Sequence, residues 1–151
     1  EGGSEIKDSV SKIIKAGIPV MGHLGLTPQS IYKFGTYSVR AKDKNEADEL
    51  INDAVLLEEI GCFATVLEKI PSELAKKVSS KVKYPLIGIG AGNQVDGQVL
   101  VIDDLIGLSQ SKLKFVKKFV DITKLIEVGV KKYKSEVLNK QFPKAKHSFL
   151  K

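Results

Sequence analysis

Phe63-Ala64-Thr65-Val66-Leu67 is a run of consecutive residues that are all apolar or Thr. A strand of this composition is typical of a parallel sheet that is covered on both faces. The segments before and after it, residues 45–60 and 71–82, have the apolar spacing that predicts amphipathic helices. A helix, a strand and a second helix in this order favour parallel βαβ units and therefore an α/β fold.

The same alternation continues on both sides of this core. We expect Asn45 to cap the helix that begins there, and Gly17 to end an earlier helix. We expect a long loop at residues 22–44. Within it, Thr27-Pro28-Gln29-Ser30 is expected to open a helical turn, because Pro is well tolerated at a first helical position. The other predicted elements are a helix at 4–16, buried strands at 18–21, 85–89 and 98–102, and two amphipathic helices with apolar faces at 115–120 and 126–137.

The number of predicted strands bears on the architecture. Four strands do not close a barrel, and a (β/α)₈ TIM barrel takes about 250 residues. A chain of 151 residues therefore fits roughly the second half of such a barrel, strands five to eight and the helices that follow them. We expect residues 1–151 to be the carboxyl-terminal part of a single TIM-barrel domain, with a loosely ordered tail at 140–151. An independent flavodoxin-like sheet is the alternative that periodicity leaves open.

Composition limits the classes of partner. The net charge of +6 comes from scattered lysines, with one arginine, Arg40, and no Trp. Nucleic-acid binding usually needs a concentrated basic stripe with stacking aromatic residues, so we expect no nucleic-acid partner. The single cysteine, Cys62, excludes a disulfide framework within the chain and favours a reducing, cytoplasmic setting. Because no apolar stretch approaches the ~20 residues that cross a bilayer, we expect no membrane association.

Two residues at predicted strand ends are candidates for chemistry. Glu68 ends the apolar strand, where partial desolvation would raise the pKa of its carboxyl group and suit it to act as a general base. The alternative is a rim glutamate paired with Lys69 or another lysine. His23 follows the predicted strand at 18–21, at the carboxyl-end rim where barrel enzymes assemble their sites. Its alternative is a histidine that hydrogen-bonds the backbone of the loop.

Two other motifs carry weaker signals. The glycine-rich loop at residues 88–93 has the character of an anion-binding loop, but a strand rather than a helix follows it, which argues against the dinucleotide fingerprint. Its glycines also fit a close approach of the backbone to a ligand or a neighbouring strand. Asp103 and Asp104 end the predicted strand at 98–102. Adjacent side chains of an extended segment point to opposite faces, so we expect a solvated or capping pair rather than a metal site.

Several motifs in order resemble the ketopantoate hydroxymethyltransferase family. They are GHLGLTPQS at 22–30, VLEKIP at 66–71, PLIGIGAGN at 85–93, EGG at 1–3, DGQVLV at 96–101 and HSF at 147–149. The resemblance implies a (β/α)₈ barrel of the phosphoenolpyruvate and pyruvate superfamily, assembled as a homodecamer and using Mg²⁺ or another divalent cation. It implies transfer of a hydroxymethyl group from 5,10-methylenetetrahydrofolate to 3-methyl-2-oxobutanoate, giving 2-dehydropantoate in pantothenate biosynthesis.

The resemblance also implies roles for three residues. Glu68 matches the glutamate that removes a proton from the metal-chelated 2-oxo acid, and His23 matches the histidine that contacts this substrate. Glu1 matches the glutamate that approaches the metal, through water. The main metal ligands of the family are expected upstream of this chain, which we therefore interpret as a fragment. Two alternatives remain: a related barrel lyase that acts on 2-oxo acids without tetrahydrofolate, and a non-catalytic α/β module that binds an anion at residues 88–93.

Overall fold

A computed structural model describes residues 1–149. The chain divides into two compact units, Glu1–Val99 and Leu100–Lys151. The last two residues of the predicted tail at 140–151 lie outside the described part of the chain. Among the residues described, no helix is both long enough and apolar enough to cross a membrane.

The first unit is built on a parallel sheet of β1 (Met21–Gly25), β2 (Ala64–Glu68), β3 (Leu86–Ile89) and β4 (Gly97–Gln98). Each strand is hydrogen-bonded to the next in the sequence, so the strand order is β1-β2-β3-β4. The predicted parallel βαβ arrangement is therefore confirmed. A flavodoxin-like sheet changes direction at a switch point and has a different order, so the observed order speaks against that alternative.

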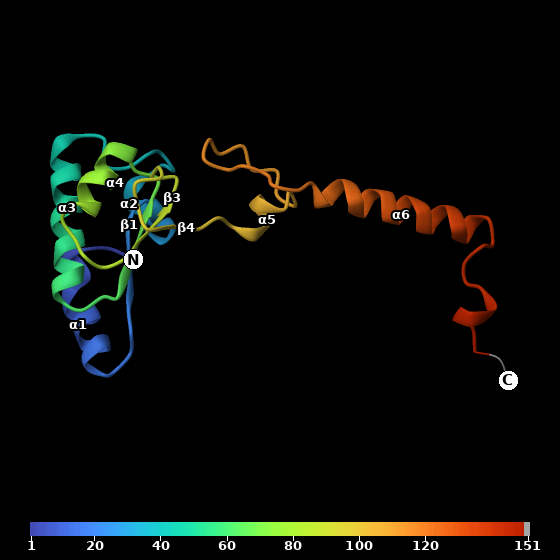
Figure 1. Cartoon of the computed structure of the whole chain (residues 1–151), viewed down its shortest axis with the longest axis horizontal. Coiled ribbons are helices and arrows are strands. Elements are labelled where there is room, and N and C mark those ends of the chain that lie inside the picture. The colour runs from blue at the N-terminus through green and yellow to red at the C-terminus, as the bar shows by residue number, and fades with distance from the viewer. Residues whose placement is uncertain (150–151) are drawn as a thin grey trace. The chain divides into compact units, whose positions relative to one another are not determined.

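Three helices pack on one side of these strands, as Figure 1 shows for α3 and α4. They are α1 (Lys7–Lys15), α3 (Lys44–Glu59) and α4 (Ser72–Ser79), close to the predicted ranges. The side chain of Asp43 caps α3 by accepting a hydrogen bond from the amide of Glu46. The prediction of Asn45 as the cap was wrong, because the helix begins one residue earlier and the carboxylate of Asp43 takes the capping hydrogen bond.

The two faces of the sheet differ in burial. Thr65, Leu67 and Leu86 are fully buried against the helices, and Gly22 on this face leaves room for Leu57 of α3. The opposite face, the open face, carries the buried Ala64 and otherwise side chains that are partly buried or exposed: Met21, His23, Val66, Glu68, Ile87 and Ile89. The helices of this chain therefore cover one face of the sheet, whereas the composition of β2 predicted cover on both.

The boundaries of two strands were predicted wrongly. β1 begins at Met21, so the Gly-His-Leu-Gly motif lies in the strand and not in the loop after it. Gly22 and Leu24 alternate with His23 in burial, which is the period of a strand. β4 ends at Gln98, residues 99–101 belong to no helix or strand, and Ile102, predicted to end the strand, begins α5 (Ile102–Leu105). After β1, the expected turn at Pro28–Ser30 does form, and α2 (Ile31–Phe34) follows it.

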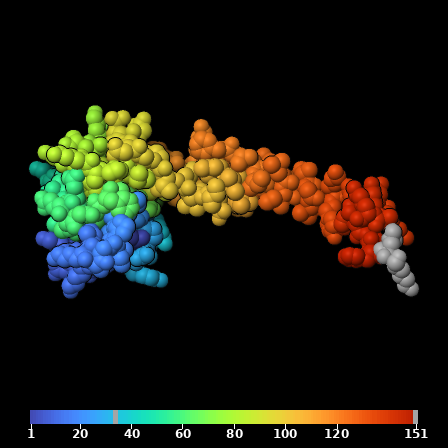
Figure 2. Space-filling view, turned by 60° about the horizontal axis from the view of Figure 1, so that its bottom comes forward, coloured from blue at the N-terminus to red at the C-terminus, as the bar shows by residue number. Residues whose placement is uncertain are grey.

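The second unit contains α5 and the long helix α6 (Ile122–Leu138), which confirms the later of the two helices predicted here. The helix predicted at 115–120 does not form. The amide of Phe119 instead donates to the carbonyl of Leu105, so this segment uses its hydrogen bonds to pack on α5. None of the residues of α6 is buried, and Figure 2 shows this part of the chain, coloured orange to red, at the surface. A short 3-10 turn, Ala145–His147, follows α6, and the ring of Phe142 contacts Tyr133 and His147.

The packing of α3 on the sheet gives a test of this fold. Leu57 is 1 % exposed, and its truncation leaves a cavity beside Gly22 that the rigid sheet cannot fill. We expect Leu57→Ala to lower the free energy of unfolding of the complete protein by about 2–5 kcal/mol. Glu59→Ala, an exposed position on the same helix, should change it by less than about 0.5 kcal/mol. Equal urea midpoints for the two variants would contradict the assigned face of α3.

Candidate active site

His23 and Glu68 meet at the carboxyl ends of β1 and β2. The register pairs His23 with Val66, and Glu68 lies two residues further along β2, so both side chains belong to the open face of the sheet. The Nε2 atom of His23 lies 3.1 Å from Oε2 of Glu68. Their side chains are 21 % and 16 % exposed. The structure therefore joins two residues that the sequence predicted separately, and it shelters both from most of the solvent.

Glu1 approaches the same histidine from the other side. Its Oε1 atom lies 3.8 Å from Nδ1 of His23, and its Oε2 atom accepts a hydrogen bond from the amide of Gln29. The amide of Gly2 donates to the carbonyl of His23 at 3.1 Å, an isolated antiparallel bridge that fixes the first residues against β1. His23 thus has one carboxylate at each ring nitrogen, and the three predicted site residues form one cluster.

The environment of Glu68 changes its acidity. Burial of the carboxyl group raises the pKa of Glu68, because a partly desolvated site disfavours the charged form. The neighbouring His23 opposes this shift by charge and by hydrogen bonding, the carboxylate of Glu1 adds to it, and Lys69 opposes it. A carboxylate with a raised pKa is a stronger base than an ordinary one, which suits Glu68 to remove a proton from a bound molecule.

The alternative for Glu68 was a pair with a lysine at the rim, but Glu68 and Lys69 have separate partners in the structure. The Nζ atom of Lys69 donates to the carbonyl of Tyr37. Lys69 has a φ of 52°, and its carbonyl accepts from the amide of Arg40 at 2.9 Å. Lys69 therefore holds the long connection after β1 against the end of β2, while Glu68 contacts His23.

The glycine-rich loop after β3 is explained by close packing. A side chain at Gly92 would lie 2.5 Å from Cβ of Ser72 at the start of α4, and Gly92 has a φ of 82° that favours glycine. Its carbonyl accepts from the side chain of Gln98 at 2.8 Å. The contacts of this loop are with the neighbouring helix and strand, the second of the two explanations that the sequence offered.

The aspartate pair lies elsewhere than predicted. Asp103 and Asp104 belong to α5 and not to the end of a strand. Asp104 is buried and its carboxylate accepts from the hydroxyl of Ser109. The prediction of an extended pair was wrong because β4 ends four residues before α5 begins.

The same residues bear on whether this chain can hold a divalent cation. Within the described residues 1–149, no three His, Cys, Asp or Glu side chains are placed to hold a metal ion. Glu1 and Glu68 both face the imidazole of His23, from opposite ring nitrogens. The residues of this chain alone therefore do not fit a complete metal site.

Asp53, a buried carboxylate on α3, was not predicted from the sequence as a functional residue. Its Oδ1 atom accepts a hydrogen bond from the amide of Ser4 at 2.9 Å. Burial raises the pKa of Asp53, the hydrogen bond from Ser4 opposes this, and the charges of Glu5 and Glu49 add to it. The signal in the sequence was an aspartate directly before Ala54, within the apolar face of a predicted helix.

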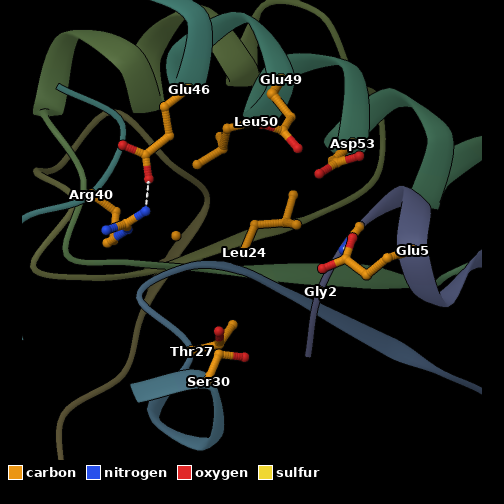
Figure 3. A pocket seen from close by; sticks show the side chains of 12 residues that line it. Gly2, Glu5, Leu24, Thr27, Ser30, Arg40, Glu46, Glu49, Leu50 and Asp53 are labelled. Atoms are coloured by element: carbon orange, nitrogen blue, oxygen red, sulfur yellow. Dashed lines mark hydrogen bonds and ion pairs between the residues drawn. The ribbon is translucent and has the colours of Figure 1, made fainter. Parts of the chain in front are cut away.

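Asp53 lies at a cavity of about 190 Å³ between α3 and the first residues of the chain. Figure 3 shows Asp53 and Glu49 projecting from α3, Gly2 and Glu5 nearby, and Leu24 of β1 beneath them. The Arg40 guanidinium pairs with Glu46 at one side of this cavity. Leu24 and His23 are adjacent on a strand, so the cavity and the His23–Glu68 pair lie on opposite faces of the sheet.

Comparison with known proteins identifies relatives of this chain. The family model described as ketopantoate hydroxymethyltransferase matches residues 1–145. Proteins named 3-methyl-2-oxobutanoate hydroxymethyltransferase from Flavobacterium johnsoniae and Bacteroides thetaiotaomicron are 54% and 55% identical over 150 residues, which is 99% of this chain and 55% of each relative. The protein of the same name from Christiangramia forsetii is 55% identical over 144 residues, 95% of this chain and 53% of that relative.

The chain thus spans about half the length of the curated relatives that it matches. This agrees with the expectation that the sequence is incomplete. The matches do not support the further prediction that the chain is the second half of a barrel.

The charges around Glu68 lead to a prediction with a definite sign. Removal of the imidazole in His23→Ala takes away a group that lowers the pKa of Glu68, so this pKa should rise further. Removal of the carboxylate in Glu1→Gln takes away a group that raises it, so the pKa should fall. Titration of the Glu68 carboxyl carbon by NMR in the complete protein measures both shifts. Shifts in the same direction for the two variants would contradict the arrangement.

Proposed function

The chain belongs to the ketopantoate hydroxymethyltransferase family, and from this premise we propose that it forms part of an enzyme that transfers a hydroxymethyl group to 3-methyl-2-oxobutanoate. The donor is 5,10-methylenetetrahydrofolate and the product is 2-dehydropantoate. The observation that carries the proposal is the His23–Glu68 pair, a partly buried carboxylate of raised pKa on the open face of a parallel sheet.

Glu68 is the general base of this reaction. Its carboxylate takes the proton from C3 of the 2-oxo acid, and the electron pair of that C–H bond becomes available on C3. This pair forms the new bond to the methylene carbon of the folate donor as one of the two C–N bonds of that carbon breaks. Water then supplies the hydroxyl oxygen as the second C–N bond breaks, and the two folate nitrogens take up the proton from C3 and the proton released by water. The raised pKa of Glu68 strengthens the base without a need for high pH.

His23 orients Glu68 and contacts the substrate. Its Nε2 atom lies 3.1 Å from the Glu68 carboxylate, which restricts the directions in which that carboxylate can accept a proton. A base must lie within hydrogen-bond reach of the proton that it removes. The bound oxo acid therefore lies against the open face, beside the carboxyl ends of β1 and β2.

The open face supports a barrel in the complete protein. Met21, Val66, Ile87 and Ile89 place apolar side chains on it, and the interior of a (β/α)₈ barrel is filled by layers of such side chains. The consecutive strand order is that of a barrel. β1 and β4 are the edges of this sheet, and further strands on them would remove unpaired edges that promote aggregation.

The metal predicted by the resemblance enters no step of this mechanism, because the described residues do not make a complete site. Glu1 is proposed as an outer contact, through water, to an ion whose inner ligands would come from the remainder of the protein. Assembly as a homodecamer stays a prediction from the resemblance, and a cytoplasmic location stays a prediction from the single cysteine.

The proposed base is tested by isotope exchange. Glu68→Gln keeps the size of the side chain but cannot take a proton. We expect the exchange of the C3 hydrogen of 3-methyl-2-oxobutanoate with D₂O, followed by NMR in the complete enzyme, to slow by about 10²–10⁴-fold. Glu73→Gln, an exposed position in the first turn of α4, is the control and should leave the exchange unchanged.

An unchanged rate in Glu68→Gln, with thermal unfolding like that of the unaltered enzyme, would remove Glu68 from the role of base. The alternative barrel lyase is distinguished by a second measurement on the unaltered enzyme. A lyase turns over its 2-oxo acid without tetrahydrofolate, whereas the proposed transferase forms product only with the methylene donor present.

A further inference from the structure

Asp53 is a buried carboxylate that the proposed reaction does not use. It lies on α3, on the covered side of the sheet, and is 9 % exposed. Burial of a carboxylate is unfavourable unless hydrogen bonds compensate it. A position inside the apolar face of α3, next to Ala54 and Leu50 of the core, therefore calls for a physical reason.

The contacts of Asp53 connect α3 to the first residues of the chain. Its Oδ1 atom accepts from the amide of Ser4 at 2.9 Å. Its Oδ2 atom occupies the space in which a side chain at residue 3 would lie, because a Cβ built on Gly3 would come within 1.9 Å of it. Figure 3 shows the Asp53 carboxylate directed from α3 toward the segment that contains Gly2 and Glu5.

The same short segment is fixed a second time on the opposite side. The amide of Gly2 donates to the carbonyl of His23 at 3.1 Å, which ties it to β1. Gly2 is thus held to the strand and Ser4 to the helix, with Gly3 between them. Glu1 directly precedes this doubly held segment, and its carboxylate lies 3.8 Å from Nδ1 of His23.

We propose that Asp53 is a positioning residue, which holds residues 2–4 so that the Glu1 carboxylate stays at Nδ1 of His23 while Glu68 stays at Nε2. The proposal rests on the proposed function, since it gives Asp53 its effect through the residues that carry that reaction. Asp53 itself lies on the other face of the sheet from the substrate. Its action is therefore mechanical and indirect, through the backbone of the segment that it holds.

The test is a double-mutant cycle between Asp53 and Glu1 in the complete enzyme. Asp53→Ala removes the acceptor for the Ser4 amide. We expect kcat/KM to fall by about tenfold, the lower end of the effect of removing a group that orients the residues of a site. In a Glu1→Gln background, the same substitution should cause little further loss, because the side chain that it positions has already lost its charge. Asp53→Asn keeps an oxygen at the place of Oδ1 and should restore most of the activity.

Glu49→Gln is the matched control. Glu49 lies one helical turn before Asp53, lines the same cavity and is exposed, so the change from carboxylate to amide there should leave kcat/KM unaltered. If Asp53→Ala yields little folded protein, Asp53→Ser takes its place in the cycle. Serine also withdraws the acceptor from Ser4 but keeps a polar group in the cavity.

Equal fold losses from Asp53→Ala in the presence and absence of the Glu1 carboxylate would overturn the proposal, since that result describes a general defect of structure. Amide hydrogen exchange of Ser4 provides a readout that does not depend on the reaction. We expect Asp53→Ala to speed it and Asp53→Asn to preserve its protection. Unchanged protection in Asp53→Ala would also overturn the proposal. Failure of the proposed function shows separately, in the C3 exchange of Glu68→Gln.

Discussion

The register between β1 and β2 is the constraint on which the rest of this structure depends. It pairs His23 with Val66 and Gly25 with Glu68, and this places the imidazole and the carboxylate on one face at adjacent strand ends. Leu24 and Leu67 then fall on the other face, where the helices bury them. A slip of β2 by one residue would turn Leu67 to the open face and Glu68 to the covered face, away from the histidine. Core packing and the candidate site are thus fixed by the same set of hydrogen bonds.

Much of this arrangement could be predicted from the sequence. An apolar strand ending in Glu68, between two helices, was sufficient to predict parallel βαβ units and a partly desolvated carboxylate. The position of β1 was not predicted correctly. Ile18-Pro19-Val20 is as apolar as a strand, and the glycines of the motif that follows are typical of a loop. In the structure those glycines serve packing: a side chain at Gly22 would collide with Thr65 and Leu57.

Other features depend on contacts between segments that are distant in the sequence. The segment at 115–120 has helical periodicity, yet the amide of Phe119 bonds to Leu105 and the helix does not form. Asp53 gave only a weak signal, since an aspartate on a helix is usually solvated. Its partner Ser4 lies 49 residues away. The contacts of Glu1 and Glu68 with opposite nitrogens of His23 likewise follow from the folded backbone and not from spacing along the chain.

In the proposed reaction, a 2-oxo acid loses its C3 proton on the open face, beside His23 and Glu68. The most direct measurement is a crystal structure of the complete enzyme with 3-methyl-2-oxobutanoate bound. We expect C3 of the oxo acid on the open face, within about 3–3.5 Å of a carboxylate oxygen of Glu68, as reaction geometry requires. An oxo acid bound in the cavity beside Asp53, on the helix-covered side of the sheet, would contradict it.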